Sequence, residues 1–281
     1  MPNPNQCSLG EVMIYQIART LEDGILAFHG FGSPLVQIAL HLAKHTHAPG
    51  LVLVAGATYG VNPSPPFLAP TSNDWVMDRG AECHLDIEEL FDLAASGRMG
   101  RMFLSGLQID RFGNLNVTRL GQERLQLKLP GGGGGCNLSC DVANITIWTA
   151  AHRVSPDAKG RRRFRLVADC DFITSVGHRT AEGKSRSEMG YRGQGPDGIV
   201  TELGVFDFDE SGHARLAALY PDVDADIVCE NTHFDFPMRK DLSMIPLPTR
   251  EMVEFIRDLD PLKIHERELK PEERARSFPL A

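Results

Sequence analysis

The N-terminal part of the chain alternates between two kinds of apolar pattern. Apolar residues at a helical spacing occur in "SLGEVMIYQIARTLEDG" (8–24), "PLVQIALHLAKH" (34–45) and "DIEELFDLAASG" (86–97). Short continuous apolar runs occur in "ILAF" (25–28), "LVLVAG" (51–56) and "RMFLSG" (101–106). Continuous runs of this kind are typical of parallel strands that are covered on both faces. The alternation predicts right-handed βαβ units around a parallel sheet.

The helix ends carry recognisable signals. Ser8 and Glu11 have the spacing of a capping box, Pro34 falls in a first turn, where a missing amide hydrogen costs nothing, and Asp86 is a cap. Gly24 and Gly97 are expected to end the first and third helices.

The second half of the chain is richer in strand signals. Strand-like segments are "ITIWTA" (145–150), "FRLVADCDFI" (164–173), "GIVTELGVFDF" (198–208) and "ARLAALYP" (214–221), with "DESG" (209–212) as a turn. Antiparallel strands are therefore expected to extend or cover the sheet. A last helix is predicted for "TREMVEFIRDL" (249–259). With no repeat or low-complexity linker, residues 1–281 are expected to form a single domain with a charged C-terminal tail from about residue 262.

Composition and charge exclude several classes of protein. Of the 281 residues, 42% are hydrophobic, and the formal net charge is -8, which gives little electrostatic support for nucleic-acid binding. The one dense basic run, "KGRRRFR" (159–165), is interpreted as a solvated hairpin tip. No segment has the length of a membrane span, and the first residues lack the pattern of a signal peptide. A cytoplasmic protein without membrane contact is expected.

Six cysteines are scattered along the chain and are expected to be reduced and mostly buried. Cys136 and Cys140 form a C-x3-C pair, but no second pair or histidine nearby completes a tetrahedral zinc set. We therefore expect no metal site.

Three glycine-marked loops are candidates for chemistry. In "FHGFGSPLVQIA", Gly30 and Gly32 precede a helix, so that free N–H groups there are able to face an anion or a carbonyl oxygen. A plain strand-to-helix turn explains the same residues, because a dinucleotide-binding pattern would need glycine at Leu35. In "LSGLQIDRFGNLNVT", Asp110 and Asn114 suit a turn held by side-chain bonds to the backbone, with catalysis as the alternative.

The third loop, "LPGGGGGCNLSCDVAN", places five glycines (131–135) before a predicted helix. Because glycine loses the most conformational freedom on folding, five in a row indicate a backbone that closely approaches another surface. An oxyanion or thioester site is one hypothesis, and a flexible linker is the other.

Four motifs in order together resemble the β-type subunit of family I CoA-transferases such as glutaconate CoA-transferase. They are a strand followed by G-x-G-x-P-x-x-x-A, the central "GLQIDRFGNLN", the glycine loop running into a helix, and "GPDGIVTELGVFDF". The ending, "LGVFDF" and "PLPTREMVEFIRDLDPLKIHERE", is more similar to the β subunit of the steroid ring-opening hydrolase of the same superfamily. The resemblance implies a three-layer α/β fold with a mainly parallel sheet and additional antiparallel strands. It also implies an α-type partner subunit, in a heterodimer or heterotetramer, and acyl-CoA substrates.

The sequence departs from the transferases at the residue that defines their chemistry. In those enzymes a glutamate in an E-x-G pattern after the second strand attacks the thioester. The pattern places that glutamate at Val54, or at Ala55 with a slip of one residue, and neither side chain is a nucleophile. No catalytic residue is therefore assigned in this chain.

Three functions remain open under the resemblance. The first is hydrolytic carbon–carbon ring opening of a CoA-linked cyclic diketone in steroid catabolism, with the partner supplying an acid or base. The second is CoA transfer with a carboxylate from the partner or from elsewhere in the sequence, and the third is a non-catalytic scaffolding subunit. A stand-alone sugar-phosphate isomerase is disfavoured, because neither glycine loop contains Lys or Arg.

The resemblance also implies binding residues. Gly134 and Gly135 are expected beside the thioester carbonyl, with Gly30, Gly32 and Asn114 as further substrate-binding positions. Coenzyme A enters as part of the substrate, and no separate cofactor is expected. His29 is interpreted as structural, although it is placed to donate to a substrate oxygen. His152 and His178 are assigned no role.

Overall fold

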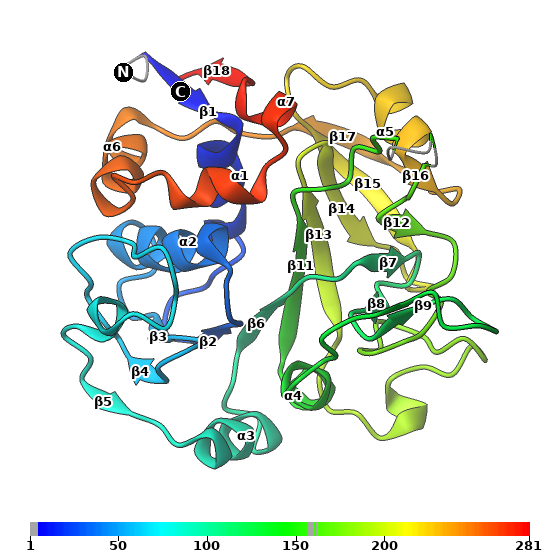
Figure 1. Ribbon diagram of the computed structural model, residues 1–281, viewed down its shortest axis with the longest axis horizontal. Helices are drawn as coiled ribbons and strands as arrows, with labels where there is room; N and C mark the ends of the chain where they lie inside the picture. The colour runs from blue at the N-terminus through cyan, green and yellow to red at the C-terminus, as the bar shows by residue number, and fades with distance from the viewer. Residues whose placement is uncertain (1–4, 157–159, 161) are drawn as a thin grey trace. The chain divides into compact units, whose positions relative to one another are not determined.

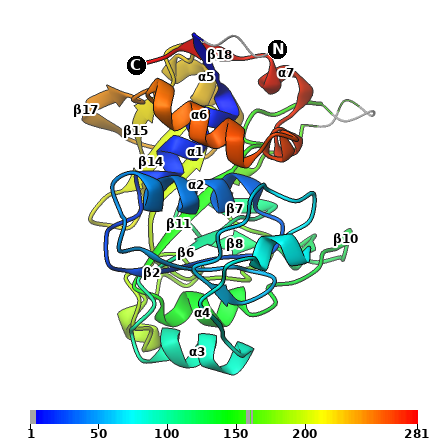
Figure 2. The ribbon, with the colours of Figure 1, turned by 90° about the vertical axis from the view of Figure 1, so that its left-hand side faces the viewer.

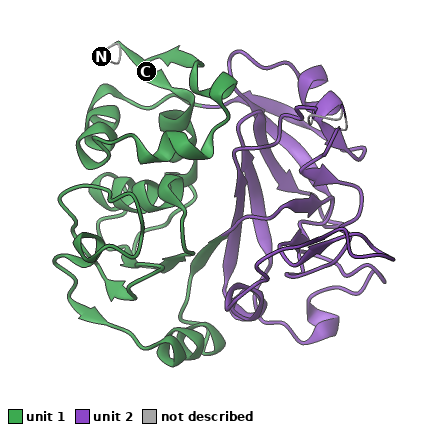
Figure 3. Ribbon diagram, viewed as in Figure 1, with its two compact units in different colours: residues 1–103, 246–281 green, residues 104–245 purple. Residues whose placement is uncertain are grey.

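The computed structural model describes residues 5–156, 160 and 162–281. It consists of two compact units (Figure 3): unit 1 is formed by residues 1–103 and 246–281, and unit 2 by residues 104–245. The single domain expected for residues 1–281 stays a prediction.

Unit 1 contains the predicted parallel strands. Strands β6 (Arg101–Leu104), β2 (Leu26–His29) and β3 (Val52–Val54) are parallel neighbours, and β4 (Gly60–Val61) and β5 (Cys83–His84) continue the order with antiparallel pairs. Helices α1 (Leu9–Ala18), α2 (Pro34–His45) and α6 (Arg250–Leu259) pack together on one side of these strands. Helix α3 (Ile87–Ala95) lies on the other side (Figures 1 and 2). The predicted layering of helix, sheet and helix is confirmed in this unit.

The predicted signals for the starts of the helices are confirmed, whereas the predicted end of the first helix is not. Ser8 and Glu11 form a reciprocal capping box at α1, and Asp86 forms another with Glu89 at α3. The first helix is shorter than predicted, because it ends at Ala18 and a turn carries the chain to Gly24. The apolar stripes of α1 and α2 supply the core; fully buried side chains there are Leu9, Val12, Met13, Ile14, Ile17, Leu35, Ile38 and Leu42. Their burial drives the packing of the two helices on the sheet.

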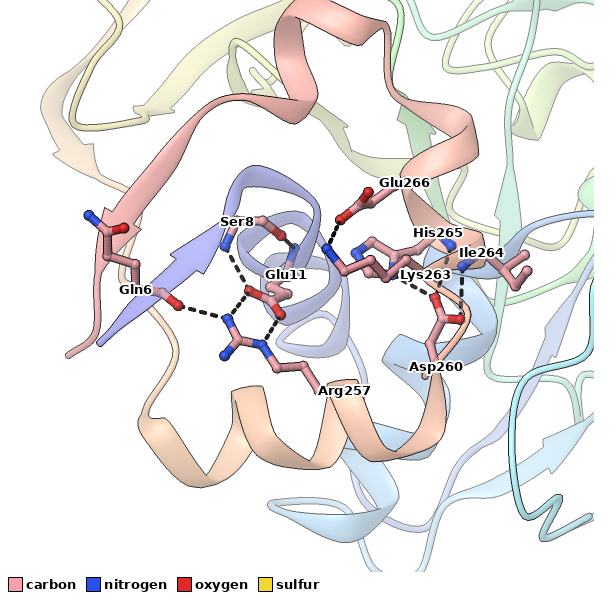
Figure 4. Close-up of polar contacts among 9 residues, drawn as sticks. All are labelled: Gln6, Ser8, Glu11, Arg257, Asp260, Lys263, Ile264, His265 and Glu266. Carbon is pink, nitrogen blue, oxygen red and sulfur yellow. Dashed lines mark hydrogen bonds and ion pairs between the residues drawn. The ribbon is translucent and has the colours of Figure 1, made fainter. Parts of the chain in front are cut away.

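The C-terminal segment, predicted as a charged tail, is folded onto unit 1. It forms a 3-10 helix η3 (Ile264–Glu268), helix α7 (Pro271–Arg274) and strand β18 (Ser277–Pro279), which pairs antiparallel with β1 (Gln6–Ser8). Arg257 of α6 donates from Nε and Nη2 to the Glu11 carboxylate at 2.7 and 3.1 Å (Figure 4). The start of the chain is therefore joined to β18 by strand pairing and to α6 by the Arg257–Glu11 ion pair.

Unit 2 combines a five-strand and a four-strand arrangement. Strand β11 (Asn144–Thr149) is parallel to β13 (Pro196–Thr201), which is followed by antiparallel β14 (Gly204–Phe208) and β15 (Ala214–Leu219) and then by parallel β17 (Met238–Met244). The four-strand order is β16 (Thr232–His233), β12 (Leu166–Val167), β7 (Gln108–Asp110) and β8 (Leu115–Asn116). A small pair, β9 (Arg119–Leu120) and β10 (Leu127–Lys128), and helices α4 (Gly135–Asp141), η2 (Ser187–Met189) and α5 (Ala225–Asn231) complete the unit.

Several sequence expectations for unit 2 are corrected. "GIVTELGVFDF" is two antiparallel strands, because the Thr201 hydroxyl accepts the N–H groups of Leu203 and Gly204 and turns the chain. "FRLVADCDFI" contributes only the two strand residues of β12. All six cysteines are free thiols, as expected, but only Cys7 is buried. The proposed hairpin tip at 159–165 lies partly outside the described residues.

Among the described residues, no helix combines the length and the apolar character that crossing a bilayer requires.

Candidate functional site

The carboxyl ends of β2 and β3 meet at one edge of unit 1, and His29 joins them. Its Nδ1 lies 2.9 Å from Gly30 O, and its Nε2 lies 3.2 Å from Gly56 N. Because a carbonyl accepts and an amide donates, these contacts fix the neutral tautomer with the proton on Nδ1. Burial lowers the pKa of His29 to about 4. Both ring nitrogens are thus occupied inside the chain, which supports the structural interpretation of His29.

The end of β3 and the loop that follows it contain no carboxylate or other nucleophile at the position of the family glutamate. Val54 is fully buried in the strand, between Phe28 and Val61. Ala55 N donates to Gly60 O at 2.9 Å and closes the following turn. A Cβ on Gly56 would lie 2.1 Å from His29 O, so only glycine fits there. The edge is therefore close-packed, without a nucleophile at Val54 or Ala55.

The first glycine loop lies beside a small polar cavity of unit 1. Gly32 has a left-handed backbone, with φ of +61°, and its N–H reaches Ser72 Oγ at 3.3 Å. The cavity of about 250 Å³ is also lined by Glu268, whose Oε2 lies 3.5 Å from Leu35 N in the first turn of α2. Burial raises the pKa of Glu268 to about 8. The Gly32 N–H and the Leu35 N–H at the start of α2 thus already have acceptors within this chain, Ser72 and Glu268.

A second polar pocket of unit 1, of about 240 Å³, is lined in part by Asp260 and His265. Figure 4 shows the contacts of this pair. The Asp260 carboxylate accepts the N–H groups of Ile264 and His265, and its Oδ2 lies 2.6 Å from His265 Nδ1. Desolvation acts to raise the pKa of Asp260, but these hydrogen bonds outweigh it and lower the pKa. The pair fixes the turn between α6 and η3. His265 Nε2 is buried against Gly10 of α1, where a Cβ would lie 3.1 Å away.

In unit 2, Asp110 and Asn114 form the turn that the sequence predicted. The Asp110 carboxylate accepts the N–H groups of Phe112 and Asn114 and the Asn114 side-chain amide, at 2.8 to 3.0 Å. Burial raises the pKa of Asp110 to about 6, although these bonds act in the opposite direction. Asn114 Oδ1 accepts the N–H of Gly177 at 2.7 Å. Asn114 is 1% exposed, so its described role is to join two segments of backbone.

The third glycine loop leads into α4 and presents the Gly134 amide at the helix start. Gly135 N donates to Gly132 O at 2.9 Å, so this N–H is occupied within the loop. Gly134 is the N-cap of α4, and among the described residues its N–H has no hydrogen-bond acceptor. Gly133 has φ of +51°, a conformation that favours glycine. The loop thus presents the Gly134 N–H at the end of a helix, where a developing negative charge is stabilised.

The glycine loop is attached to the segment after the Asp110 turn. Gly131 N donates to Val117 O at 2.8 Å, and Thr174 Oγ1 accepts the N–H of Val117 at 3.0 Å. The structure therefore brings together the loops of Asn114 and Gly134 in unit 2. In unit 1 it brings together the loops of Gly30 and Val54.

The structure gives hydrogen-bond partners to His152 and His178, for which the sequence indicated none, and it reveals a further buried residue, Arg186. His152 lies between the hydroxyls of Thr201 and Thr232, at 3.0 and 2.9 Å, and burial lowers its pKa to about 3. His178 Nε2 donates to Pro196 O at 2.7 Å. Arg186, which contacts α4, lies in "GKSRSEMGYRG" and carries no pattern that marks it out from other surface-type arginines.

No family model matches the chain. Three curated relatives match most of its length. The B-type subunit of 3-oxoadipate CoA-transferase from Pseudomonas knackmussii is 29% identical, covering 90% of this chain and 93% of the relative. The B-type subunit of glutaconate CoA-transferase from Acidaminococcus fermentans is 29% identical over 89% and 92%, respectively. The cholesterol ring-cleaving hydrolase IpdB subunit of Rhodococcus jostii is 28% identical over 84% and 87%.

Solved structures share the fold. The decarboxylase AibA/AibB matches with a TM-score of 0.79 and 28% identity, covering 93% of this chain and 98% of the solved chain. Rhodococcus jostii IpdAB matches with a TM-score of 0.73 at 24% identity, covering 94% and 99%. The chain is therefore homologous to B-type subunits of the CoA-transferase superfamily and has their α/β fold, as its motifs indicated. These relatives are subunits of enzymes.

Proposed function

We propose that this B-type member of the CoA-transferase superfamily is one subunit of a heteromeric enzyme that acts on acyl-CoA thioesters. We further propose that the enzyme hydrolyses a carbon–carbon bond of a cyclic diketone linked to CoA, with an A-type partner supplying the acid or base. One observation carries this proposal: the glutamate position is a buried valine, Val54, whereas the glycine loop keeps a free N–H at Gly134. The chain thus keeps a group that stabilises charge but lacks the family nucleophile.

The proposed reaction consumes one water molecule. A base of the partner removes a proton from water, and the hydroxide adds to a ring ketone. The bond from that carbon to its neighbour in the ring breaks, and the electron pair forms an enolate on the adjacent carbonyl group. The acid then protonates the enolate carbon, which leaves a new carboxylate on the opened ring. In this scheme, Gly134 N–H donates to the carbonyl oxygen on which negative charge develops.

The relatives support chemistry other than CoA transfer. One of them is named a ring-cleaving hydrolase subunit, and a structural neighbour is named a decarboxylase. We place the substrate among steroid-derived rings and the enzyme in the cytoplasm, on the strength of the hydrolase relative and the expectations from the sequence. CoA transfer is the second candidate, because two relatives are CoA-transferase subunits. It would require a carboxylate from the partner or from another part of this chain.

The intact mass of both chains distinguishes these two reactions. The copurified complex is incubated with a candidate acyl-CoA and then with borohydride, which reduces a glutamyl thioester to an alcohol. Hydrolysis predicts unchanged masses on both chains while acyl-CoA is consumed and one 18O atom enters the product from labelled water. A loss of mass on either chain would establish covalent transfer and overturn the hydrolytic proposal.

A matched pair of variants tests the role of the glycine loop against a scaffolding role. Gly134 has φ of -76°, which proline adopts, so Gly134→Pro removes the N–H while keeping this angle. Gly134→Ala keeps the N–H. We expect kcat to fall by about 10²-fold for the proline variant and much less for the alanine variant, as for the loss of one oxyanion donor. Equal activity of the two variants would favour a chain that only scaffolds.

A further inference from the structure

Arg186 is a buried cation in unit 2 whose surroundings contain mainly backbone oxygens. It is 6% exposed and precedes η2, in the loop between Gly177 and Gly195. All five hydrogen bonds of its guanidinium group that the structure describes go to carbonyl oxygens. A buried charge is costly unless it is paired and hydrogen-bonded. These carbonyl oxygens satisfy the donors of Arg186 without an opposite charge, which indicates that the arginine is there to hold backbone segments in place.

The five bonds join three segments of unit 2. Nη2 donates to Ser139 O and Cys140 O, at 2.6 and 3.2 Å, in the last turn of α4. Nη1 donates to Val176 O and Gly177 O at 2.9 and 3.3 Å. Nε donates to Gly193 O at 2.7 Å. One rigid fork thus holds the end of α4 and both ends of its own loop.

The bonds to α4 satisfy groups that the helix leaves open. The last carbonyls of a helix have no partner within it and carry partial negative charge, which a cation complements. Gly193 N adds a bond to Cys140 O at 3.1 Å. At the other end, Gly131 N donates to Val117 O at 2.8 Å. The C-terminal end of the seven-residue helix is therefore held directly, and the loop that leads to the Gly134 N–H at its start is anchored at Gly131.

The same residue connects the two loops that the sequence singled out in unit 2. Gly177 O accepts from Arg186, and Gly177 N donates to Asn114 Oδ1 at 2.7 Å. Asn114 in turn is held by Asp110 through two hydrogen bonds. A continuous chain of polar contacts therefore runs from the Asp110 turn through Arg186 to α4.

We propose that Arg186 is a positioning residue that fixes the direction of the Gly134 N–H by clamping the C-terminal end of α4. This inference rests on the proposed function in assigning the Gly134 N–H to a substrate oxygen. A donor that acts as charge develops contributes more to the transition state than to substrate binding. Loosening α4 should therefore lower kcat more than it raises KM, because the donor loses its alignment.

The test compares Arg186→Gln with Arg179→Gln in the complex with the A-type partner. Arg179 is the matched control: it belongs to the same loop and also bonds to carbonyls, Ser211 O and Gly183 O, but not to α4. We expect Arg186→Gln to lower kcat by about 10²-fold, with KM changed less than about threefold. Arg186→Lys should also be defective, because a single ammonium group cannot replace the planar fork. Added guanidinium ion should partly restore kcat of Arg186→Ala.

Thiol labelling provides a readout that does not depend on the reaction. Cys140 lies in the clamped turn of α4 and is half-buried, and its Sγ donates to Cys136 O. We expect the rate of Cys140 alkylation in the native complex, followed by mass spectrometry, to rise at least tenfold in Arg186→Gln and to stay unchanged in Arg179→Gln.

The outcomes separate this inference from the proposed function. An unchanged rate of Cys140 labelling in a folded Arg186→Gln complex would show that Arg186 does not clamp α4. Faster labelling with a wild-type kcat would also overturn the inference, because α4 would then be more mobile without any loss of catalysis. If no candidate acyl-CoA is consumed even by the wild type, the proposed function fails while labelling still tests the clamp. Should Arg186→Gln not fold, Arg186→Lys undergoes the same measurements.

Discussion

At the scale of single residues, the β2–β3 edge of unit 1 is defined by groups that do not exchange protons. Val54 is apolar and fully buried, and His29 uses both ring nitrogens for Gly30 O and Gly56 N. The desolvated ring of His29, with a pKa of about 4, stays neutral near pH 7. Neither residue is able to replace a missing glutamate, so the proposed reaction requires an acid or base from another position or another chain.

Glu268 is a titratable residue of this unit whose environment predicts a pH effect on stability. Its pKa in the folded chain is about 8, whereas an unperturbed glutamate titrates near 4.3. The unfolded chain thus releases this proton first, and the contribution of Glu268 to stability falls as the pH rises from about 4.3 to 8. Glu268→Gln should remove this slope and stabilise the chain at pH 7.5, relative to pH 5.5, by roughly 1 to 3 kcal/mol.

Urea unfolding at the two pH values measures this effect. Glu254→Gln on the exposed side of α6 serves as the control and should keep the wild-type slope. If Glu268→Gln and the wild type lose stability equally between pH 5.5 and 7.5, the carboxyl group is already ionised in the folded chain.

At the scale of elements, short helices of this protein are held by contacts at their ends. Helix α4 has only seven residues, too few to be stable alone. Arg186 holds its C-terminal end, and the bond from Gly131 N to Val117 O anchors the loop that precedes it. Helix α1 has ten residues, and Glu11 caps it while also accepting from Arg257 of α6. In both cases a side chain or loop distant in sequence completes what local propensity leaves open.

The link between α1 and α6 makes a quantitative prediction. Glu11 is 4% exposed and receives Ser8 N and two donors of Arg257. Truncation by Glu11→Ala leaves Ser8 N and Arg257 Nε without their acceptor, while Arg257 Nη2 keeps its bond to Gln6 O. This change should lower the free energy of unfolding by about 2 to 3 kcal/mol. The surface change Glu254→Ala should stay within about 0.5 kcal/mol of the wild type.

A double-mutant cycle with Arg257→Leu assigns this loss to the pair. We expect a coupling free energy of about 1 to 3 kcal/mol in chemical unfolding. A coupling near zero would mean that Glu11 acts only as a helix cap.

At the scale of the whole molecule, the proposed activity depends on a second chain. The relatives include B-type subunits of CoA-transferases, and the neighbours include AibA/AibB and IpdAB. The net charge of -8 gives no indication of a nucleic-acid partner. A partner that supplies the acid or base would explain how the fold persists without a nucleophile at Val54.

This dependence is testable by titration. The isolated chain should consume no acyl-CoA, and activity should appear on addition of the A-type partner and saturate when the two chains are present in equal amounts. Circular dichroism of the isolated chain checks that it is folded beforehand. Consumption of acyl-CoA by the folded chain alone would place the acid or base within this sequence and direct attention to its buried carboxyl groups.

The sequence by itself determined the elements whose signals are local. The period of the apolar residues fixed α2 at its observed bounds, and the Ser8–Glu11 capping box and the predicted cap Asp86 located two helix starts. The resemblance to the superfamily rested on four motifs that occur in the expected order along the chain. Local patterns suffice here because helix caps and apolar stripes involve residues a few positions apart.

Only the tertiary structure decided which side chains meet across long separations. The bonds of Arg186 to Ser139 and of Arg257 to Glu11 span 47 and 246 positions, and no local pattern encodes such pairs. The same limit explains why the C-terminal segment was predicted as a tail, although β18 pairs with β1. Desolvation likewise requires the folded chain, because the pKa shifts of His29 and Glu268 arise from burial. The sequence therefore determined the helices with local signals and the likeness to B-type CoA-transferase subunits, and the fold decided how the candidate loops are held.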